Sequence, residues 1–117
     1  MTYVTGFLTP VKTEDKARYI KSAEASWPLF QKYGALSQVE TWGEDVPDGK
    51  VTSFPMAVKL EEGEVVVFSW VTWPDRATAD ACFRKMQDDP DFANMDMPFD
   101  GKRMMWGGFS VAVEGRA

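Results

Sequence analysis

The stretch Glu64–Trp73, EVVVFSWVTW, constrains the fold more than any other part of the chain. It carries no charge after Glu64, and apolar side chains alternate onto both of its faces. One face holds Val65, Val67, Val71 and Trp73, and the other holds Val66, Phe68 and Trp70. A strand that is apolar on both faces must be covered on both. The stretch therefore predicts a strand in the middle of a sheet, with a packed layer on each side.

Composition places the chain among globular proteins of one domain, spanning residues 1–117. The net charge of -5 and a pI of about 4.7 argue against nucleic-acid binding, which needs a basic surface. No apolar run approaches the roughly 18 residues that span a membrane, and the first residues lack the pattern of a signal peptide. The single Cys82 permits no internal disulfide. We therefore expect a cytoplasmic protein without membrane contact.

Histidine is absent, and this excludes several kinds of chemistry. Ser-His-Asp and Cys-His catalysis and a histidine general base all need an imidazole. One cysteine without histidine does not make a structural zinc site. No phosphate-binding, dinucleotide-binding or calcium-binding motif is present. The sequence predicts neither a metal nor a cofactor.

The order of expected elements defines the fold class. Strands are expected at residues 3–8, 35–42, 64–73 and 103–113, and helices at 13–33 and 75–88. This β-α-β-β-α-β order is that of the ferredoxin-like α+β sandwich, a four-stranded antiparallel sheet with two helices on one face. Pro10 is expected to end the first strand, and Pro28 to kink or break the first helix. The core stripe of that helix is expected at Ala17, Ile20, Ala23, Trp27 and Phe30.

Two helices cover only one face of such a sheet, so Phe68 and Trp70 need another cover. The simplest cover is the sheet of a second subunit, which gives a symmetric homodimer. The alternative is residues 43–63, a connection of about 20 residues that is too long for a hairpin loop. Its apolar side chains predict a short helix or a packed excursion.

Several stretches resemble those of a known family. They are Tyr33-Gly34-Ala35-Leu36, the VPDGKVT block at residues 46–52, Val67-Phe68-Ser69-Trp70 and the MPFDGKRM block at residues 97–104. With Val4-x-Gly6-Phe7 and Gly107-Gly108-Phe109, they are similar to the YbaA-like family of small bacterial proteins, domain of unknown function 1428. The resemblance implies a dimeric α/β barrel of ferredoxin-like subunits, with no established activity or catalytic residues. Wider relatives include cofactor-free monooxygenases, isomerases, haem-degrading enzymes and stress-response proteins.

Two blocks share a proline, an acid, a glycine and a base: residues 47–50 and 98–103. Each Asp-Gly pair is typical of a tight turn leading into a strand. Alternatively, Lys50, Lys102 and Arg103 form a cationic rim for a small anionic ligand. Arg103 is the strongest candidate, because a guanidinium grips a carboxylate with two hydrogen bonds. The structural alternative is that Arg103 pairs with a nearby acid such as Glu40 or Asp45.

Glu40 is the best candidate for a general base, because a carboxyl beside Trp42 in a cleft has its pKa raised by desolvation. The alternative is a solvated or ion-paired Glu40. Five aromatic side chains are candidates to line a pocket for a planar ligand, or else to fill the dimer core: Tyr3, Trp42, Trp70, Trp106 and Phe109.

Three functions remain open from sequence. The first is a small-molecule binding or sensing dimer with an aromatic-lined pocket. The second is a cofactor-independent oxygenase or isomerase for a small planar or enolic substrate, with Glu40 as base and Arg103 holding the anion. The third is a structural or partner-binding dimer without a ligand. A cavity that contains both Glu40 and Arg103 favours the second, and a cavity filled by side chains leaves the third.

Overall fold

The computed structural model describes residues 2–117, which form four strands and four α-helices. The elements in chain order are β1 (Tyr3–Lys12), α1 (Lys16–Lys32), β2 (Ser37–Glu40), α2 (Phe54–Ala57), β3 (Glu64–Trp73), α3 (Arg76–Met86), α4 (Pro90–Ala93) and β4 (Met105–Ser110). A single 3-10 turn, Thr13–Asp15, joins β1 to α1.

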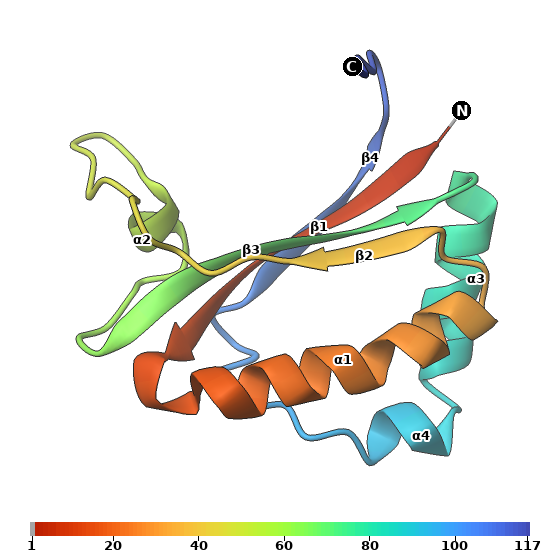
Figure 1. Ribbon diagram of the computed structural model, residues 1–117, viewed down its shortest axis with the longest axis horizontal. Helices are drawn as coiled ribbons and strands as arrows, with labels where there is room; N and C mark the ends of the chain where they lie inside the picture. The colour runs from red at the N-terminus through yellow and green to blue at the C-terminus, as the bar shows by residue number, and fades with distance from the viewer. Residues whose placement is uncertain (1) are drawn as a thin grey trace.

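The strands form one antiparallel sheet in the order β2-β3-β1-β4. The two long strands β1 and β3 are central, and their register pairs Tyr3 with Trp73 and Lys12 with Glu64. Figure 1 shows α1 and α3 on one side of this sheet and α2 on the other. The expected ferredoxin-like α+β fold is confirmed, with β3 in the central position that its two apolar faces require.

Side-chain caps explain where the short helices begin. Asp75 accepts a 2.8 Å hydrogen bond from the backbone N–H of Thr78 and starts α3. Ser53 accepts from Met56 at 3.0 Å at the start of α2. Each cap satisfies an N–H that has no partner within its own helix. The excursion at residues 43–63 thus contains the short helix that its apolar content predicts.

Neither proline interrupts its element as expected. Pro10 lies within β1, opposite Val66. The ladder between β1 and β4 ends at Leu8, so beyond that point β1 is an edge strand, where a residue without an N–H is tolerated. Pro28 lies inside α1, which runs unbroken to Lys32.

The predicted stripe of α1 is displaced around the helix. The buried residues are Tyr19, Ser26 and Phe30, whereas Ile20 is 43% exposed. Ile20 instead lines a shallow groove beside β2, together with Trp27 and Leu36. The prediction counted only apolar residues, so it did not include the buried Ser26.

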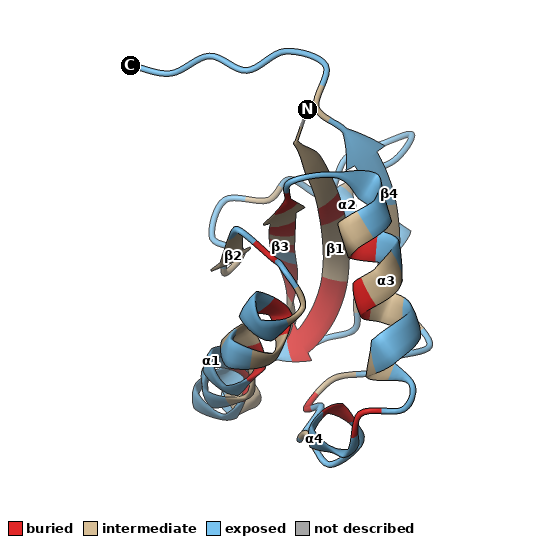
Figure 2. Ribbon diagram, turned by 90° about the vertical axis from the view of Figure 1, so that its right-hand side faces the viewer, coloured by how far each residue is buried: buried red, intermediate tan, exposed pale blue. Residues whose placement is uncertain are grey.

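The core lies between the two central strands, β1 and β3, on one side and the helices on the other, as the colouring of Figure 2 shows. Trp73 is fully buried and packs edge-on against Phe30, with ring centroids 6.2 Å apart. Its indole Nε1–H donates to Thr5 Oγ1 at 3.1 Å, which satisfies the one polar group of the ring. No helix in the described chain is long and apolar enough to cross a membrane.

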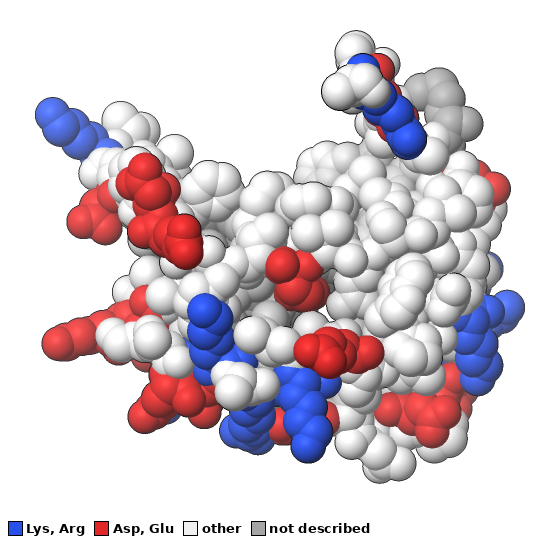
Figure 3. Space-filling model, in the orientation of Figure 1, with Lys and Arg blue, Asp and Glu red and all other residues white. Residues whose placement is uncertain are grey.

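The far side of the sheet remains apolar and largely uncovered. We call it the open face; it comprises Val4, Leu8, Val39, Phe68, Trp70, Met105 and Phe109. The α2 excursion covers one end, where Val58 and Val66 are both buried and Phe54 meets Phe68. Phe68, Met105 and Phe109 stay 47%, 46% and 61% exposed. Figure 3 shows charged side chains mostly along α1 and around α2, with an uncharged surface above the sheet between α2 and the chain ends.

Candidate functional site

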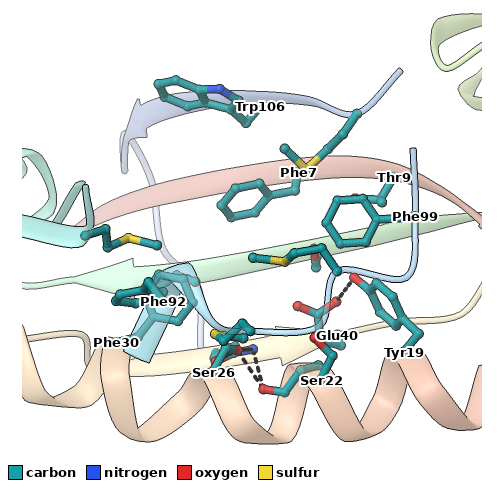
Figure 4. Close-up of a pocket in the computed structure, with 18 of the residues that line it drawn as sticks. Phe7, Thr9, Tyr19, Ser22, Ser26, Phe30, Glu40, Phe92, Phe99 and Trp106 are labelled. Carbon is teal, nitrogen blue, oxygen red and sulfur yellow. Dashed lines mark hydrogen bonds between the residues drawn. The ribbon is translucent and has the colours of Figure 1, made fainter. Parts of the chain in front are cut away.

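A cavity of about 410 Å³ lies between the sheet and the helices, on the side opposite the open face. Its strand residues are Phe7, Thr9, Gln38, Glu40, Ser69, Val71 and Trp106. Its helix residues are Tyr19, Ser22, Ala23, Ser26, Phe30, Phe83, Met86, Gln87 and Phe92, and the segment before β4 adds Met95, Met97, Phe99 and Met104. The cavity opens to solvent beside Glu40 and Trp106, which are both exposed residues. Figure 4 shows these side chains converging from all sides.

Small side chains create this space. On the face that α1 turns toward the sheet, Ser22 and Ala23 lie on one turn and Ser26 on the next. On β3, Ser69 stands between the larger Val67 and Val71 on the same face. The aromatic residues around them do not reach into the gap, so the interior stays hollow there.

Tyr19 and Glu40 form the polar centre of the cavity. The phenol of Tyr19 donates a 2.6 Å hydrogen bond to Oε1 of Glu40, which Figure 4 marks with a dashed line. Part of the Glu40 side chain remains accessible at the mouth, but its carboxyl is turned inward. Burial of that carboxyl raises its pKa above the ordinary 4.5, and hydrogen bonds from Tyr19, Gln38 and Ser69 offset the rise only in part.

The same burial acts on the phenol. It raises the pKa of Tyr19 far above its ordinary value, and the neighbouring negative charge of Glu40 adds to the rise. Tyr19 therefore remains protonated and acts as a hydrogen-bond donor at every ordinary pH.

The other polar groups of this wall bind one another. Gln38 Nε2 donates to Ser26 Oγ at 2.9 Å and to the Ala23 carbonyl at 3.2 Å. Ser26 in turn donates to the Ala23 carbonyl at 2.6 Å. Glu40 stands at the edge of this network: Tyr19 bonds its Oε1, and hydrogen bonds from Gln38 and Ser69 also act on its carboxyl.

A strap formed by residues 94–104 closes one side of the cavity with methionine and Phe99 side chains. Arg18 Nε donates to Asp96 Oδ2 at 2.6 Å, and Ser22 donates to the Asp96 carbonyl. These contacts fasten the strap to α1.

The structure separates Arg103 from Glu40. Both Nη atoms of Arg103 donate to the Glu64 carboxylate at 2.7 Å, and Nε donates to Asp100 at 2.9 Å. These charge-assisted bonds lower the pKa of both Glu64 and Asp100. The side chain of Arg103 is 17% exposed and that of Glu64 only 4%. The guanidinium is thus held between β3 and the Asp100 turn, outside the cavity.

The two lysines of the expected cationic rim are also absent from the cavity lining. Lys50 belongs to the excursion on the open-face side, and Lys102 is exposed in the turn that Asp100 organises. The two Asp-Gly blocks therefore do not meet around this cavity.

The predicted aromatic residues are divided among different places. Trp106 lines the cavity and stacks on Phe83 with centroids 5.8 Å apart. Trp42 lies next to Tyr19, at 6.4 Å between centroids, and Lys16 Nζ sits 5.2 Å from its ring. Trp70 belongs to the open face and packs against Phe68 at 5.3 Å.

Tyr3 and Phe109 lie outside the cavity and account for the glycines in the strands. The phenol of Tyr3 crosses Gly108 so closely that a Cβ there would collide with it. The ring of Phe109 lies over Gly6 and Gly107, on the open face. These glycines therefore leave room for side chains of this same chain.

Sequence reasoning missed Tyr19, Thr9 and Ser69 as site residues. The first available signal was Thr9 in β1 and Ser69 in β3, two hydroxyls on the same face as Phe7. The second signal was the run of Tyr19, Ser22, Ala23 and Ser26 at helical spacing, which mixes small and polar residues.

Among the described residues, no group of three or more His, Cys, Asp or Glu side chains is arranged to hold a metal ion. Cys82 is fully buried, and burial raises the pKa of its thiol to about 11. A thiol of this kind packs as a core residue and is a poor nucleophile.

The fold and site define a ferredoxin-like α+β domain with an internal cavity. A solved structure of a dimeric ferredoxin-like protein from an uncultured marine organism matches it with a TM-score of 0.62 at 15% identity, over 98% of this chain and 100% of the other. The YbaA proteins of Escherichia coli (strain K12) and Shigella flexneri, both termed uncharacterized, are each 49% identical over 116 residues, 97% of this chain and 99% of theirs. Residues 2–101 match the family model described as protein of unknown function (DUF1428), and the chain belongs to that family.

Proposed function

We propose that the protein is a small-molecule binding or sensing homodimer whose ligand occupies the cavity beside Glu40. The observation that carries this proposal is a hollow of about 410 Å³ with apolar walls and a single polar centre. Ligand sites commonly combine apolar walls with a few placed polar groups. The ligand we propose is compact and mainly apolar, with an aromatic part against Phe7, Phe99 and Trp106. A structural dimer without a ligand has no need of this space.

The open face supports the homodimer. Phe68, Met105 and Phe109 are each close to half exposed or more, in one continuous surface of the sheet. Monomers rarely leave such a surface in water. The marine protein with the same fold is described as dimeric. Two copies joined by their open faces leave each cavity on the outside of its own sheet.

Binding can be tested with the neutral fluorescent dye N-phenylnaphthylamine, which brightens in an apolar site. We expect saturable binding to the wild type and its loss in Ala23→Phe, whose new ring fills the cavity. Ala25→Phe is the matched control, because Ala25 lies on the exposed side of the same helix. Equal binding by both variants, or no binding by the wild type, would reject the cavity as a ligand site.

A second candidate is favoured by the Glu40 carboxyl itself. A carboxyl with a raised pKa beside a phenol donor is suited to moving a proton at an enolisable carbon without a cofactor. An oxygenase or isomerase of this type is tested by deuterium exchange into a phenyl ketone, followed by NMR. The reaction should depend on Glu40 and vanish in Glu40→Gln. No exchange above the rate in buffer would leave the binding function alone.

A further inference from the structure

We propose that the ligand carries a protonated amine, which pairs with the carboxylate of Glu40 inside the cavity. This inference rests on the proposed binding function and adds the charge and the end group of the ligand. It also reverses the expectation of an anionic ligand.

The charge of the cavity wall is the first argument. Its lining contains one carboxyl, one phenol and no lysine or arginine. An anionic ligand would meet the Glu40 carboxylate in an apolar site with nothing to neutralise it, which is costly. A cation meets an opposite charge there.

The partners of the other inward-facing acids are the second argument. Glu64 pairs with Arg103 at 2.7 Å, and the buried Asp89 accepts from the Tyr33 phenol and also pairs with Lys32 at 3.4 Å. In the part of the chain that the structure describes, no salt bridge involves Glu40, whose hydrogen-bond donors are neutral groups such as the phenol of Tyr19. Carboxylates removed from water are normally paired. A ligand amine would supply the missing positive charge.

The geometry of the polar centre is the third argument. An ammonium group has three donors and no acceptor. A carboxylate has several acceptor positions, of which Tyr19 fills one at Oε1 of Glu40, and the hydroxyls of the buried Thr9 and Ser69 line the same wall. A hydroxyl accepts as well as donates, so these oxygens can surround an ammonium group at this end of the cavity. Tyr19 already donates to Oε1, which holds the carboxylate in place for the ligand.

The apolar walls suit the remainder of such a ligand. Aromatic faces such as those of Phe7, Phe99 and Trp106 attract cations as well as rings. Methionine side chains from the strap add adaptable contact. A ligand with a hydrocarbon or aryl group and a terminal amine therefore matches both the apolar walls and the polar end at Glu40.

The test uses three molecules with one skeleton: phenylbutylamine, phenylbutanol and phenylbutanoic acid. Each is titrated against the wild type, Glu40→Gln and Glu14→Gln by competition with N-phenylnaphthylamine at neutral pH. The Glu14 variant loses the same charge from an exposed site outside the cavity. We expect the amine to bind the wild type at least about tenfold more tightly than the alcohol, because hydrogen bonds between charged groups are the stronger ones. The acid should bind most weakly.

The preference for the amine should disappear in Glu40→Gln and persist in Glu14→Gln. An amine that binds no better than the alcohol, or a preference that survives in Glu40→Gln, would overturn the inference while leaving ligand binding intact. Tighter binding of the acid would overturn it as well. Failure of the dye itself to bind would reject both the inference and the function on which it rests.

Discussion

The hydroxyl of Tyr19 lies 2.6 Å from Oε1 of Glu40 and joins the first turn of α1 to the last residue of β2. The two residues are 21 positions apart in sequence, on elements that pack against each other. The bond links a phenol that stays protonated with a carboxyl whose pKa is raised above its ordinary value.

Tyr19→Phe removes a hydrogen bond that lowers the pKa of Glu40, so we expect that pKa to rise further. Stability should fall by about 1–2 kcal/mol, since the lost bond was to a charged group. Carbon-13 NMR titration of the glutamate carboxyls measures the pKa. Tyr33→Phe is the control, because Tyr33 donates to Asp89 instead. A shift of Glu40 in the Tyr33 variant, or no shift in the Tyr19 variant, would contradict the assignment.

Glu40→Gln should stabilise the fold at neutral pH. The folded-state pKa of Glu40 lies above the ordinary 4.5, so the native state binds its proton more tightly than the unfolded chain does. The cost of ionising Glu40 is therefore absent below pH 4.5 and grows until the pH passes the folded pKa. The stability that Glu40→Gln gains over the wild type should therefore increase with pH over the same range. Urea unfolding at a series of pH values measures this difference.

Glu64→Gln should change the free energy of unfolding in the opposite direction and destabilise the fold at neutral pH. Arg103 lowers the pKa of Glu64, so the stabilising contribution of its carboxylate is present above the ordinary 4.5 and is lost as the pH falls through the lowered value. The variant should be less stable than the wild type at neutral pH and approach it in acid. If the stability changes of the two glutamine variants followed the pH in parallel, at least one of the two environments would not be as described.

Phe109→Asp should dissociate the homodimer that we propose. Phe109 is 61% exposed on the open face, so the substitution removes little packing within one subunit. In a dimer it would bury an unpaired carboxylate in each copy, raising the dissociation constant by about a hundredfold or more. Sedimentation equilibrium at micromolar concentration gives the mass.

Leu36→Asp is the control for this experiment. Leu36 is 56% exposed but lies in the groove beside β2, off the open face. Its variant should remain dimeric. A wild-type monomer, or dissociation by Leu36→Asp alone, would show that the open face is not the interface.

Thr5→Val should destabilise the protein by about 1–3 kcal/mol, because it leaves the indole N–H of Trp73 buried without an acceptor. Both side chains are essentially inaccessible to water. Thr5→Ser keeps the acceptor and should cost less. Urea unfolding monitored by tryptophan fluorescence measures both, and equal losses would mean that the hydrogen bond contributes nothing.

Much of the fold could be predicted from residue patterns. The alternation of Glu64–Trp73 predicted a central strand, and β1 and β3 are the central strands. Asp75 predicted the start of α3, and its side chain caps that helix. These features depend on neighbours in sequence, which a pattern can describe. Pro10 and Ile20 were misplaced because their positions depend on where β4 begins and how α1 is rotated against the sheet.

The candidate site could be predicted only in part. Glu40 was identified from its place beside Trp42, and its carboxyl does lie in a cavity with a raised pKa. Arg103 was matched with the wrong acid in sequence reasoning, because Glu64 is distant along the chain but adjacent after folding. The cavity itself arises because small residues on α1 and β3 face each other. The sequence of one segment does not reveal which residues of another segment it will face.

By itself, the sequence determined the class of fold, because strand alternation, helix caps and prolines act over a few residues. It also determined that one face of the sheet would need a cover beyond the two helices. Only the tertiary structure decided that Tyr19 would meet Glu40, that Arg103 would be held by Glu64, and that Trp70 and Trp106 would lie on opposite faces of the sheet. These relations depend on the packing angle of α1 and the path of residues 94–104, which arise from contacts between distant segments.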